Sequence, residues 1–242
     1  MNRTFLDIHT HTIVSGHAFS TLAEMVAEAQ RQGMSLLGIT EHGPSIPGTC
    51  DPIYFRNLHV VPRRWDNLSL LLGAELNILD TTGRLDLDES YYKRLDIRIA
   101  GIHGFCWQGG TKEENTQGVI HAISNPWTHV ISHPGDGAAD LFFEPLLEAS
   151  KQHRTLLEVN STSMRPARGL LKSYENNLEI LRLAKRMNVP IILGSDAHIA
   201  KDIANYEHCL PLLKETDFPS DLIMNYQRPE VLLDFLQIEL KS

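Results

Sequence analysis

The sequence predicts an α/β protein, a distorted (β/α)7 barrel of the TIM type in a single domain, residues 1–242. Seven short apolar runs have strand length and no polar alternation, as parallel strands buried on both faces do. Helical periodicity appears between several of them. Residues at or just past the run ends recur near the ~30 residues of one barrel unit. These residues, His11, His42, Glu75, His103, His133, Asn160 and Asp196, stand 31, 33, 28, 30, 27 and 36 positions apart.

The strands are expected where Ile, Leu and Val gather. In order, the runs are Thr4–Ile8, Ser35–Thr40, Leu70–Ala74, Asp96–Ile102, His129–Ser132, Thr155–Val159 and Pro190–Gly194. No linker rich in Pro, Gly or Ser separates them, which favours one domain. No sequence repeat accompanies the spacing, which disfavours a solenoid.

Four helices are expected between or after these strands. The first takes Ser20 or Thr21 as its N-cap, continues through Gln32 and stops at the following glycine. The other three are Leu141–Gln152, Tyr174–Met187 and Pro229–Leu240. The segment Gly43–Asn67 follows no clear period, and we expect a loop excursion there with a helix near Tyr54–Leu58.

The composition disfavours several classes of partner. The chain has 22 basic and 30 acidic residues, a formal charge of −8, which argues against nucleic acid and against anionic membranes. No apolar stretch approaches the roughly 18 residues of a membrane span, and no secretory signal follows Met1. The three cysteines form no disulfide pattern, so we expect a reducing compartment, the cytoplasm.

Histidine is the unusual feature: there are 12, and many follow the ends of expected strands. His9 and His11 lie two residues apart on the first strand, so both side chains point the same way and can reach one metal ion. His17 follows in a loop that can fold back over them. Taken alone, each histidine could equally be a surface or packing residue, so the prediction rests on their coincidence.

Six of the seven expected strands deliver a His, Glu or Asp to the carboxyl end, where barrel enzymes build their active sites. The nine predicted metal ligands are His9, His11, His17, His42, Glu75, His103, His133, Asp196 and His198. Nine ligands are too many for one ion of four to six coordination. Two carboxylates that can bridge, with seven imidazoles, suit a cluster of two or three ions.

The remaining histidines lack this context. We expect surface or packing roles for His59, His121, His129, His153 and His208. Cys106 lies three residues past His103, but a thiolate there would be a tenth ligand that nothing requires. Cys106 is therefore left out of the predicted site.

The motifs resemble those of the PHP (polymerase and histidinol phosphatase) family and follow its order. They are His9-Thr10-His11, Thr40-Glu41-His42, Glu75, Gly101-Ile102-His103, Ser132-His133-Pro134 and Gly194-Ser195-Asp196-Ala197-His198. The resemblance covers nearly the whole chain and is closest to the stand-alone YcdX-type phosphatases. It implies a distorted (β/α)7 barrel around a trinuclear metal centre, in a homotrimer. The imidazole-rich ligand set favours zinc, with Mn or Fe as substitutes.

The resemblance also implies how the ligands divide. One ion would have His9, His11, Glu75 and Asp196; a second, His17, His42 and His198; a third, Glu75, His103 and His133. Glu75 would therefore bridge two ions. Asn160, at the end of Glu158-Val159-Asn160, matches the family without being a ligand.

The expected reaction is hydrolysis of a small phosphate monoester. Seven neutral imidazoles and two carboxylates carry about −2, so three divalent ions would leave about +4 in the cleft, which attracts an anion. A hydroxide that bridges two ions at neutral pH would attack phosphorus in line. We assign catalytic roles to Glu75, Asp196 and His42. Arg165 and Arg168, in the loop after the sixth strand, could bind substrate phosphate, although a solvated basic loop would have the same sequence.

Two other interpretations stay open at this point. A metal hydrolase of the amidohydrolase type also begins with His-x-His on its first strand, but it often bridges its metals with a carboxylated lysine. No expected strand here ends in Lys. A non-catalytic metal-binding module, such as some PHP domains of polymerases, would have lost ligands, and this chain has lost none. Zinc-dependent turnover of a generic phosphate monoester separates the three interpretations.

Overall fold

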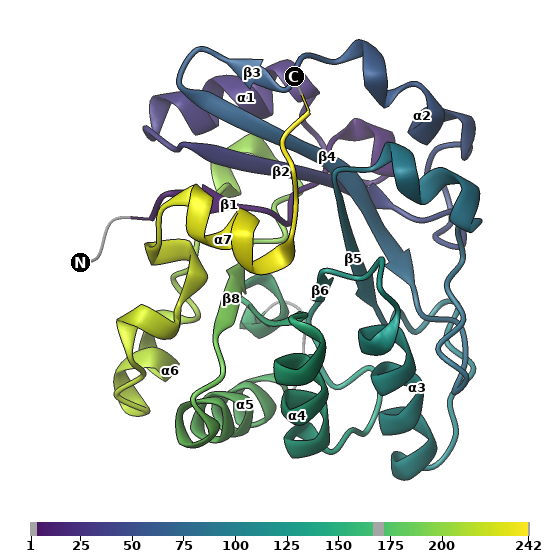
Figure 1. The fold of residues 1–242 in the computed structure, drawn as a ribbon, viewed down its shortest axis with the longest axis vertical. Coiled ribbons are helices and arrows are strands. Elements are labelled where there is room, and N and C mark those ends of the chain that lie inside the picture. Colours follow the sequence, from purple (N-terminus) through teal and green to yellow (C-terminus); the bar gives the residue numbers. More distant parts are fainter. Residues whose placement is uncertain (1–3, 167–171, 242) are drawn as a thin grey trace.

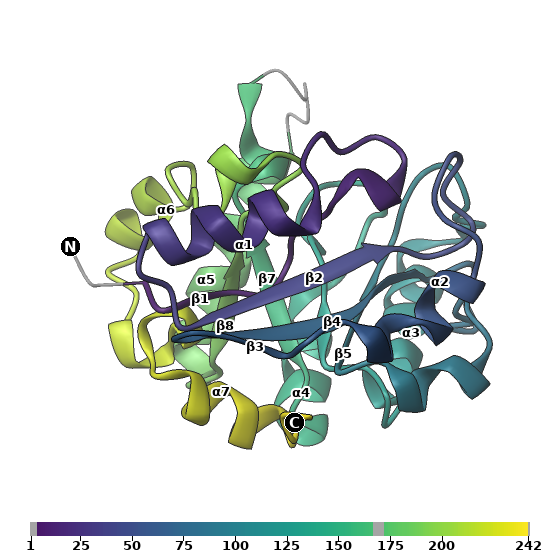
Figure 2. The ribbon, with the colours of Figure 1, turned by 90° about the horizontal axis from the view of Figure 1, so that it is seen from above.

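The computed structural model describes residues 4–166 and 172–241, in which a parallel sheet curls into a nearly closed barrel (Figure 1, Figure 2). In order of pairing, its strands are β1 (Leu6–Asp7), β2 (Leu36–His42), β4 (Leu68–Asn77), β5 (Ile97–Gly101), β6 (Val130–Ile131), β7 (Leu156–Asn160) and β8 (Ile191–Gly194). Neighbours in this series pair in parallel, and a short β3 (Arg64–Trp65) joins β4 in the antiparallel sense. The predicted seven-stranded barrel is confirmed.

Helices cover the outside of the sheet. They are α1 (Leu22–Arg31), α2 (Ile53–Arg56), α3 (Lys112–Ser124), α4 (Phe143–His153), α5 (Ser173–Met187), α6 (Leu210–Glu215) and α7 (Pro229–Leu236). Of these, α3, α4 and α5 lie side by side along one outer face (Figure 1). Thr21 is the N-cap of α1, as expected: its hydroxyl accepts from the Glu24 N–H, and the Glu24 carboxylate accepts from the Thr21 N–H.

The interior is apolar at the amino ends of the strands. Leu6, Leu36, Ile97, Leu156 and Ile192 stand at or near the starts of their strands and belong to one buried cluster. Leu232, Leu233 and Leu236 of α7 pack into the same cluster. Because apolar side chains occupy this end, the buried polar side chains of the strands are concentrated at the carboxyl end.

The barrel has a seam between β1 and β8, which form no regular ladder with each other. Their ends meet only at one parallel bridge, where the His11 N–H donates to the Ala197 carbonyl at 2.9 Å. Lower down, the Asn225 side chain fills the gap: its Oδ1 accepts from the Leu193 N–H at 2.7 Å. Its Nδ2 donates to the carbonyls of Leu193 and Leu6, at 2.9 and 3.4 Å. The Asn225 side chain thus makes the hydrogen bonds to the backbone of β1 and β8 that a neighbouring strand would otherwise make.

Two expectations about helices are corrected. The helix α3 was not expected, because its apolar residues gather in its second half and give a weak period; its capping box, Thr111 with Glu114, was the available signal. The last helix ends at Leu236 rather than Leu240, because Gln237 takes a left-handed conformation with φ 56°. The segment 43–67 holds the expected short helix, α2, and also β3.

Candidate metal centre

Glu75 lies at the middle of the candidate site. It is a fully buried residue near the carboxyl end of β4. Five imidazole nitrogens surround its carboxylate: His42 Nδ1 at 2.9 Å, His9 Nε2 at 3.4 Å and His11 Nε2 at 3.5 Å from Oε2, and His133 Nε2 at 2.9 Å and His103 Nε2 at 3.5 Å from Oε1. One carboxylate therefore contacts histidines from four other strand ends.

The remaining predicted ligands lie against this group. Asp196 Oδ1 is 3.3 Å from His11 Nε2 and 3.7 Å from His9 Nε2. His198 Nδ1 is 3.4 Å from the same Asp196 oxygen, and its Nε2 is 3.1 Å from His17 Nε2. The structure thus brings together all nine side chains that the sequence singled out.

Among the described residues, three triads of side chains have ligand atoms within 4.8 Å of one another. They are His9–His11–Asp196, His42–Glu75–His103 and His11–His42–His198. The first is contained in the division that the resemblance implied. In the other two, His11 stands where His17 was expected and His42 where His133 was expected. The rings of His11 and His42 stack with centroids 4.2 Å apart, so each of these two side chains belongs to two triads.

The backbone is strained or closely packed around these ligands. His133 and Asp196 have φ of 32° and 52°, a left-handed region that costs non-glycine residues energy and that often marks functional sites. Gly101 and Gly194 end their strands beside the site. A Cβ on Gly101 would overlap the Ser132 hydroxyl, and one on Gly194 would overlap a buried carboxylate. The glycines leave room for the packed polar groups.

Several buried polar atoms of the centre lack hydrogen-bond partners among the described residues. They include His9 Nε2, His11 Nε2, His42 Nδ1 and Glu75 Oε2. Such atoms are costly when bare, because each has lost water and gained no bond. They converge on one another from different strands, which fits divalent ions between them. Imidazole nitrogens with carboxylate oxygens form the donor set that zinc accepts.

Electrostatics give the imidazoles different protonation preferences. Burial opposes protonation of His9, but the carboxylates of Glu158 and Glu75 outweigh it and raise the pKa of His9 well above its ordinary value. Burial and two neighbouring imidazoles lower the pKa of His11 far below its own. Burial also opposes ionisation of Glu75, yet the surrounding imidazoles hold the pKa of its carboxyl well below the usual range. An ionised carboxylate among imidazoles is ready to bind a cation.

A buried acid that the sequence did not place in the site, Glu158 of β7, fixes the ligands from behind. Its Oε1 lies 2.7 Å from His9 Nδ1, on the far side of the ring from Glu75. Its Oε2 accepts from the His133 N–H at 2.8 Å and from the Asn160 amide at 3.0 Å. A carboxylate behind a ligating histidine sets its tautomer and ring orientation. The available signal was one acid inside the apolar run Leu156–Asn160.

A second buried acid, Glu41 of β2, supports the predicted ligand His11. The sequence indicates that this acid needs partners, and the structure supplies Thr12 and Ser15. Thr12 donates to it from its hydroxyl at 2.5 Å and from its N–H at 3.1 Å, and the Ser15 hydroxyl donates at 2.6 Å. Ser15 Oγ in turn lies 3.1 Å from His11 Nδ1. The acid therefore orients His11 through a serine.

The centre opens to solvent through a hollow of about 120 Å³. Since water occupies about 30 Å³ in the liquid, this space holds a group of a few heavy atoms. Ile46 and Phe105 line it together with site residues, and Phe105 is 85% exposed. A small polar group fits inside, while the rest of a larger molecule would rest on the rim.

Of the two arginines predicted to bind substrate, Arg165 alone lies within the described residues. Arg165 pairs with Asp202 at 2.9 Å and is not among the residues that line the hollow, although its neighbour Ser163 is. Arg168 lies outside the described residues. The structure therefore shows no arginine in contact with the centre within residues 4–166 and 172–241.

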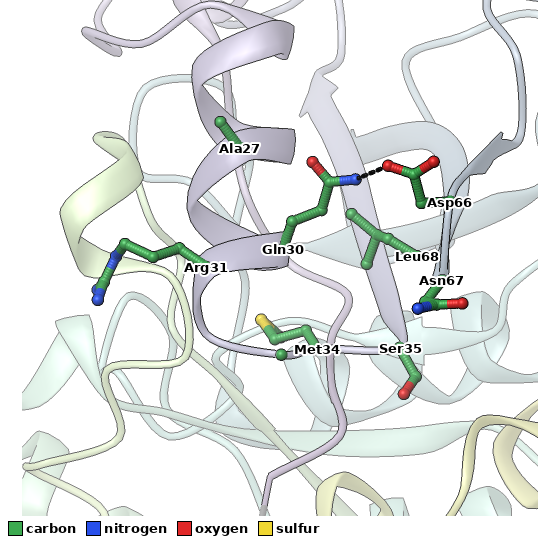
Figure 3. A pocket seen from close by; sticks show the side chains of 9 residues that line it. Ala27, Gln30, Arg31, Met34, Ser35, Asp66, Asn67 and Leu68 are labelled. Atoms are coloured by element: carbon green, nitrogen blue, oxygen red, sulfur yellow. Dashed lines mark hydrogen bonds between the residues drawn. The ribbon is translucent and has the colours of Figure 1, made fainter.

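Histidines without strand-end context lie elsewhere. His59, His121, His153 and His208 are at least partly exposed, and His129 is buried against Arg98. A larger hollow, of about 670 Å³, lies between the end of α1 and the residues before β4 (Figure 3). There Gln30 reaches Asp66 at 3.2 Å, whereas Arg31 extends away. No histidine lines it in the part of the chain that is described, so it offers no comparable site.

A parallel barrel with clustered imidazoles and carboxylates at the carboxyl ends of its strands defines a metal-binding barrel protein. The family can be stated as well: residues 7–226 match the model of the PHP domain. A "Probable phosphatase" of Caldicellulosiruptor bescii is 42% identical over 240 residues, 98% of each chain. Another, from Clostridium novyi, is 40% identical and covers 94% of this chain and 92% of its own. The chain belongs to the PHP-domain family.

Solved structures agree on the fold. The histidinol phosphate phosphatase of Lactococcus lactis, solved with zinc, L-histidinol and phosphate, matches with a TM-score of 0.60. It is 20% identical and covers 90% of this chain and 95% of its own. A chain of an archaeal ribonuclease P with mature tRNA matches with a TM-score of 0.60 at 13% identity, covering 95% and 91%. Among the described residues, no helix has the length and apolarity needed to cross a membrane.

Proposed function

We propose that this protein is a metal-dependent phosphoric ester hydrolase, a phosphatase. The observation that carries the proposal is the Glu75 carboxylate among five imidazoles at the open end of a PHP-domain barrel. Relatives more than 40% identical over nearly the full length bear the name "Probable phosphatase" and so support this class.

The finer proposal is three zinc ions per chain, held by the nine predicted ligands, with Mn or Fe as substitutes. When bound, such ions would supply an activated water and offset the charge of a phosphoryl group. The two oxygens of Glu75 face different imidazoles, which supports the proposal that this carboxylate would share its charge between ions. Asp196 lies against His11 and His42 lies against Glu75, and both are proposed as catalytic groups together with Glu75.

Residues around the proposed ligands would fix the orientation of the imidazoles and provide the space for the substrate. Glu158 and Glu41 keep the imidazoles of His9 and His11 in fixed orientations, so little reorganisation accompanies binding. The hollow of about 120 Å³ suits a phosphoryl group, and the ester's leaving group would lie against Phe105. Arg165 would reach a phosphate oxygen only by releasing Asp202.

The test combines metal analysis with turnover. Protein prepared with zinc in excess should retain two to three equivalents and hydrolyse p-nitrophenyl phosphate faster than bis(p-nitrophenyl) phosphate. Less than one equivalent of metal would overturn the cluster. Hydrolysis of amide substrates instead of phosphate esters would favour the amidohydrolase interpretation, and metal without turnover of either would favour the non-catalytic module.

We further propose that the protein works as a homotrimer in the cytoplasm on a small phosphorylated metabolite, without nucleic acid or membrane. The acidic charge of −8 supports the exclusion of polyanionic partners. Light scattering on the purified protein checks the trimer: a mass near 82 kDa is expected from three chains of 27.3 kDa. A mass of one or two chains would contradict it.

A further inference from the structure

A second concave site lies at the opposite end of the barrel. It is a hollow of about 290 Å³ before the starts of β4 and β5. Five of its seven lining residues are Lys or Arg: Arg56, Arg63, Lys93, Arg94 and Lys241. No carboxylate lines it among the described residues, although the chain has 30 acids and 22 bases. The hollow is therefore strongly positive in a chain whose net charge is −8.

Two of the lining cations, Arg63 and Lys241, share one carboxylate beneath the hollow, that of Asp96. Arg63 is buried, and its Nε donates to Asp96 Oδ2 at 2.5 Å, while Lys241 Nζ lies 2.9 Å from Asp96 Oδ1. Arg63 Nη1 donates to the carbonyls of Leu58 and Val61, both at 2.6 Å. One buried carboxylate thus serves two cations, and a net positive charge remains.

The other lining cations are available. Within the described residues, neither Lys93 nor Arg94 has an ion-pair or hydrogen-bond partner for its side chain, and both are exposed. Arg56 stacks over the Tyr91 ring at 4.9 Å. Asp88 nearby accepts from the Ser90 hydroxyl and N–H, which are the main causes of its lowered pKa, and the charge of Arg56 adds to them. Gathered like charges repel unless an anion lies between them.

A neighbouring groove of about 570 Å³ extends the hollow, and the two share Arg56 and His59. Ile53 lines the groove with 67% of its surface exposed, and Tyr54 lies beside it. Asp51 is the one carboxylate among the described residues that line it, and it already accepts from the Ile53 N–H at 2.9 Å. A cationic hollow beside an apolar groove fits a ligand with a multiply charged head and an apolar, ring-bearing body.

We propose that the hollow and its groove form a binding site for an organic polyphosphate of the nucleoside diphosphate type, separate from the metal centre. The head lies among Lys93, Arg94 and Arg56, and the ring lies on Ile53. The β5 strand joins the two sites directly: Asp96 precedes it and His103 follows it, about 17 Å or more apart for five residues of strand. The hollow of about 290 Å³ is concave and of the size of a small-molecule head group, which favours a small molecule over a macromolecule.

The probe is ADP, titrated calorimetrically into the zinc-loaded full chain with excess Mg²⁺. Because the metal centre can also hold phosphate, the double variant Lys93→Gln with Arg94→Gln isolates the basic hollow. We expect it to weaken ADP binding at least tenfold, since two charge-assisted contacts are lost. Lys214→Gln, an exposed lysine on α6, is the matched control and should bind ADP like the wild type.

Adenosine, which has no phosphate, should not bind measurably, and the double variant should keep its turnover of a phosphate monoester. Unchanged ADP affinity in the double variant would overturn the proposal. Absence of ADP binding, with sedimentation of the protein on phosphatidylserine vesicles through these two residues, would also overturn it and assign the surface to lipid. The binding readout does not depend on hydrolysis, so it stands apart from the proposed phosphatase activity.

Discussion

Both ends of the barrel bury charged and imidazole side chains. At one end these side chains find hydrogen-bond partners within the protein, and at the other several of their atoms do not. Toward the amino end, Arg98 is buried, and each of its three guanidinium nitrogens has a partner in the protein. Its partners are the Trp127 carbonyl at 2.6 Å, the Tyr92 and Leu95 carbonyls at 3.0 and 2.9 Å, and His129 Nε2 at 2.8 Å. At the carboxyl end, several ligand atoms have no such partner.

His129 and His133 show the difference within one short segment. They flank β6, and each is 7% exposed. Both ring nitrogens of His129 contact Arg98: Nδ1 accepts from the Arg98 backbone N–H at 3.1 Å, and Nε2 lies 2.8 Å from Arg98 Nη2. The contacts of this ring are therefore with the protein itself. His133 faces Glu75 and adopts a strained φ. Burial and residue type therefore do not separate a packing histidine from a candidate ligand; the state of its partners does.

The largest effect is expected for Glu75→Gln, which tests whether the side chains at the carboxyl end bind metal. The amide keeps the shape but removes the negative charge between the imidazoles, so ions on either side would repel more strongly. We expect loss of at least one metal equivalent and a fall in phosphatase turnover of at least about 10²-fold. The circular dichroism spectrum should not change, because the core is apolar. Full metal content with near wild-type turnover would show that the centre is wrongly assigned.

The next effect is expected for Glu158→Gln, which touches no proposed ion. The amide can no longer hold His9 by charge, so the ring loses its fixed orientation. Metal affinity should fall by about 10–100-fold, the usual cost of losing a partner behind a ligating histidine. Competition with a zinc chelator measures it. Glu148→Gln on the exposed face of α4 is the control; equal affinities in the two variants would remove Glu158 from the site.

At the amino end the expected effect concerns stability and pH. Burial, and then the neighbouring Arg98, lower the pKa of His129 to about 3 from 6.5. Below pH 6.5 the unfolded chain takes up a proton that the folded chain refuses, so stability falls as the pH drops toward 3. From pH 7 to 5 this costs about 2 kcal/mol.

The free energy of unfolding, measured in urea at pH 7 and pH 5, should therefore fall less in His129→Gln than in the wild type. Acid also weakens metal ligation, but that contribution is common to both proteins and cancels in the comparison. An identical loss in the two proteins would mean that His129 accepts a proton in the folded state.

The smallest effect is expected for His59→Gln. This side chain is exposed and bonds only to the Arg56 carbonyl, at 3.0 Å, among the described residues. Neither metal content nor phosphatase rate should change by more than the error of the measurement. A clear loss of metal would mean that the exposed histidine takes part in ion binding.

The sequence predicted the barrel and the convergence of the nine side chains because both depend on local features. An apolar run marks a strand, and the first polar residue after it stands at the carboxyl end. The role of Glu158 was not predictable in the same way, since His9 lies 149 residues away in the chain. The triads involving His11 and His42 depend on ring stacking across strands, and α3 lacked a strong period.

The Asn225 seam gives the barrel an uneven dynamic character. Around most of the ring, a strand amide bonds to a neighbouring strand, so it can exchange its hydrogen only when the sheet itself opens. The Leu193 N–H instead bonds to one side chain on the short 3-10 turn Met224–Tyr226. We expect this amide to exchange when the turn alone opens, without parting any pair of strands, and hydrogen exchange of the Leu193 amide checks it. The paired strands and the Asn225 turn that closes the barrel are therefore expected to open separately.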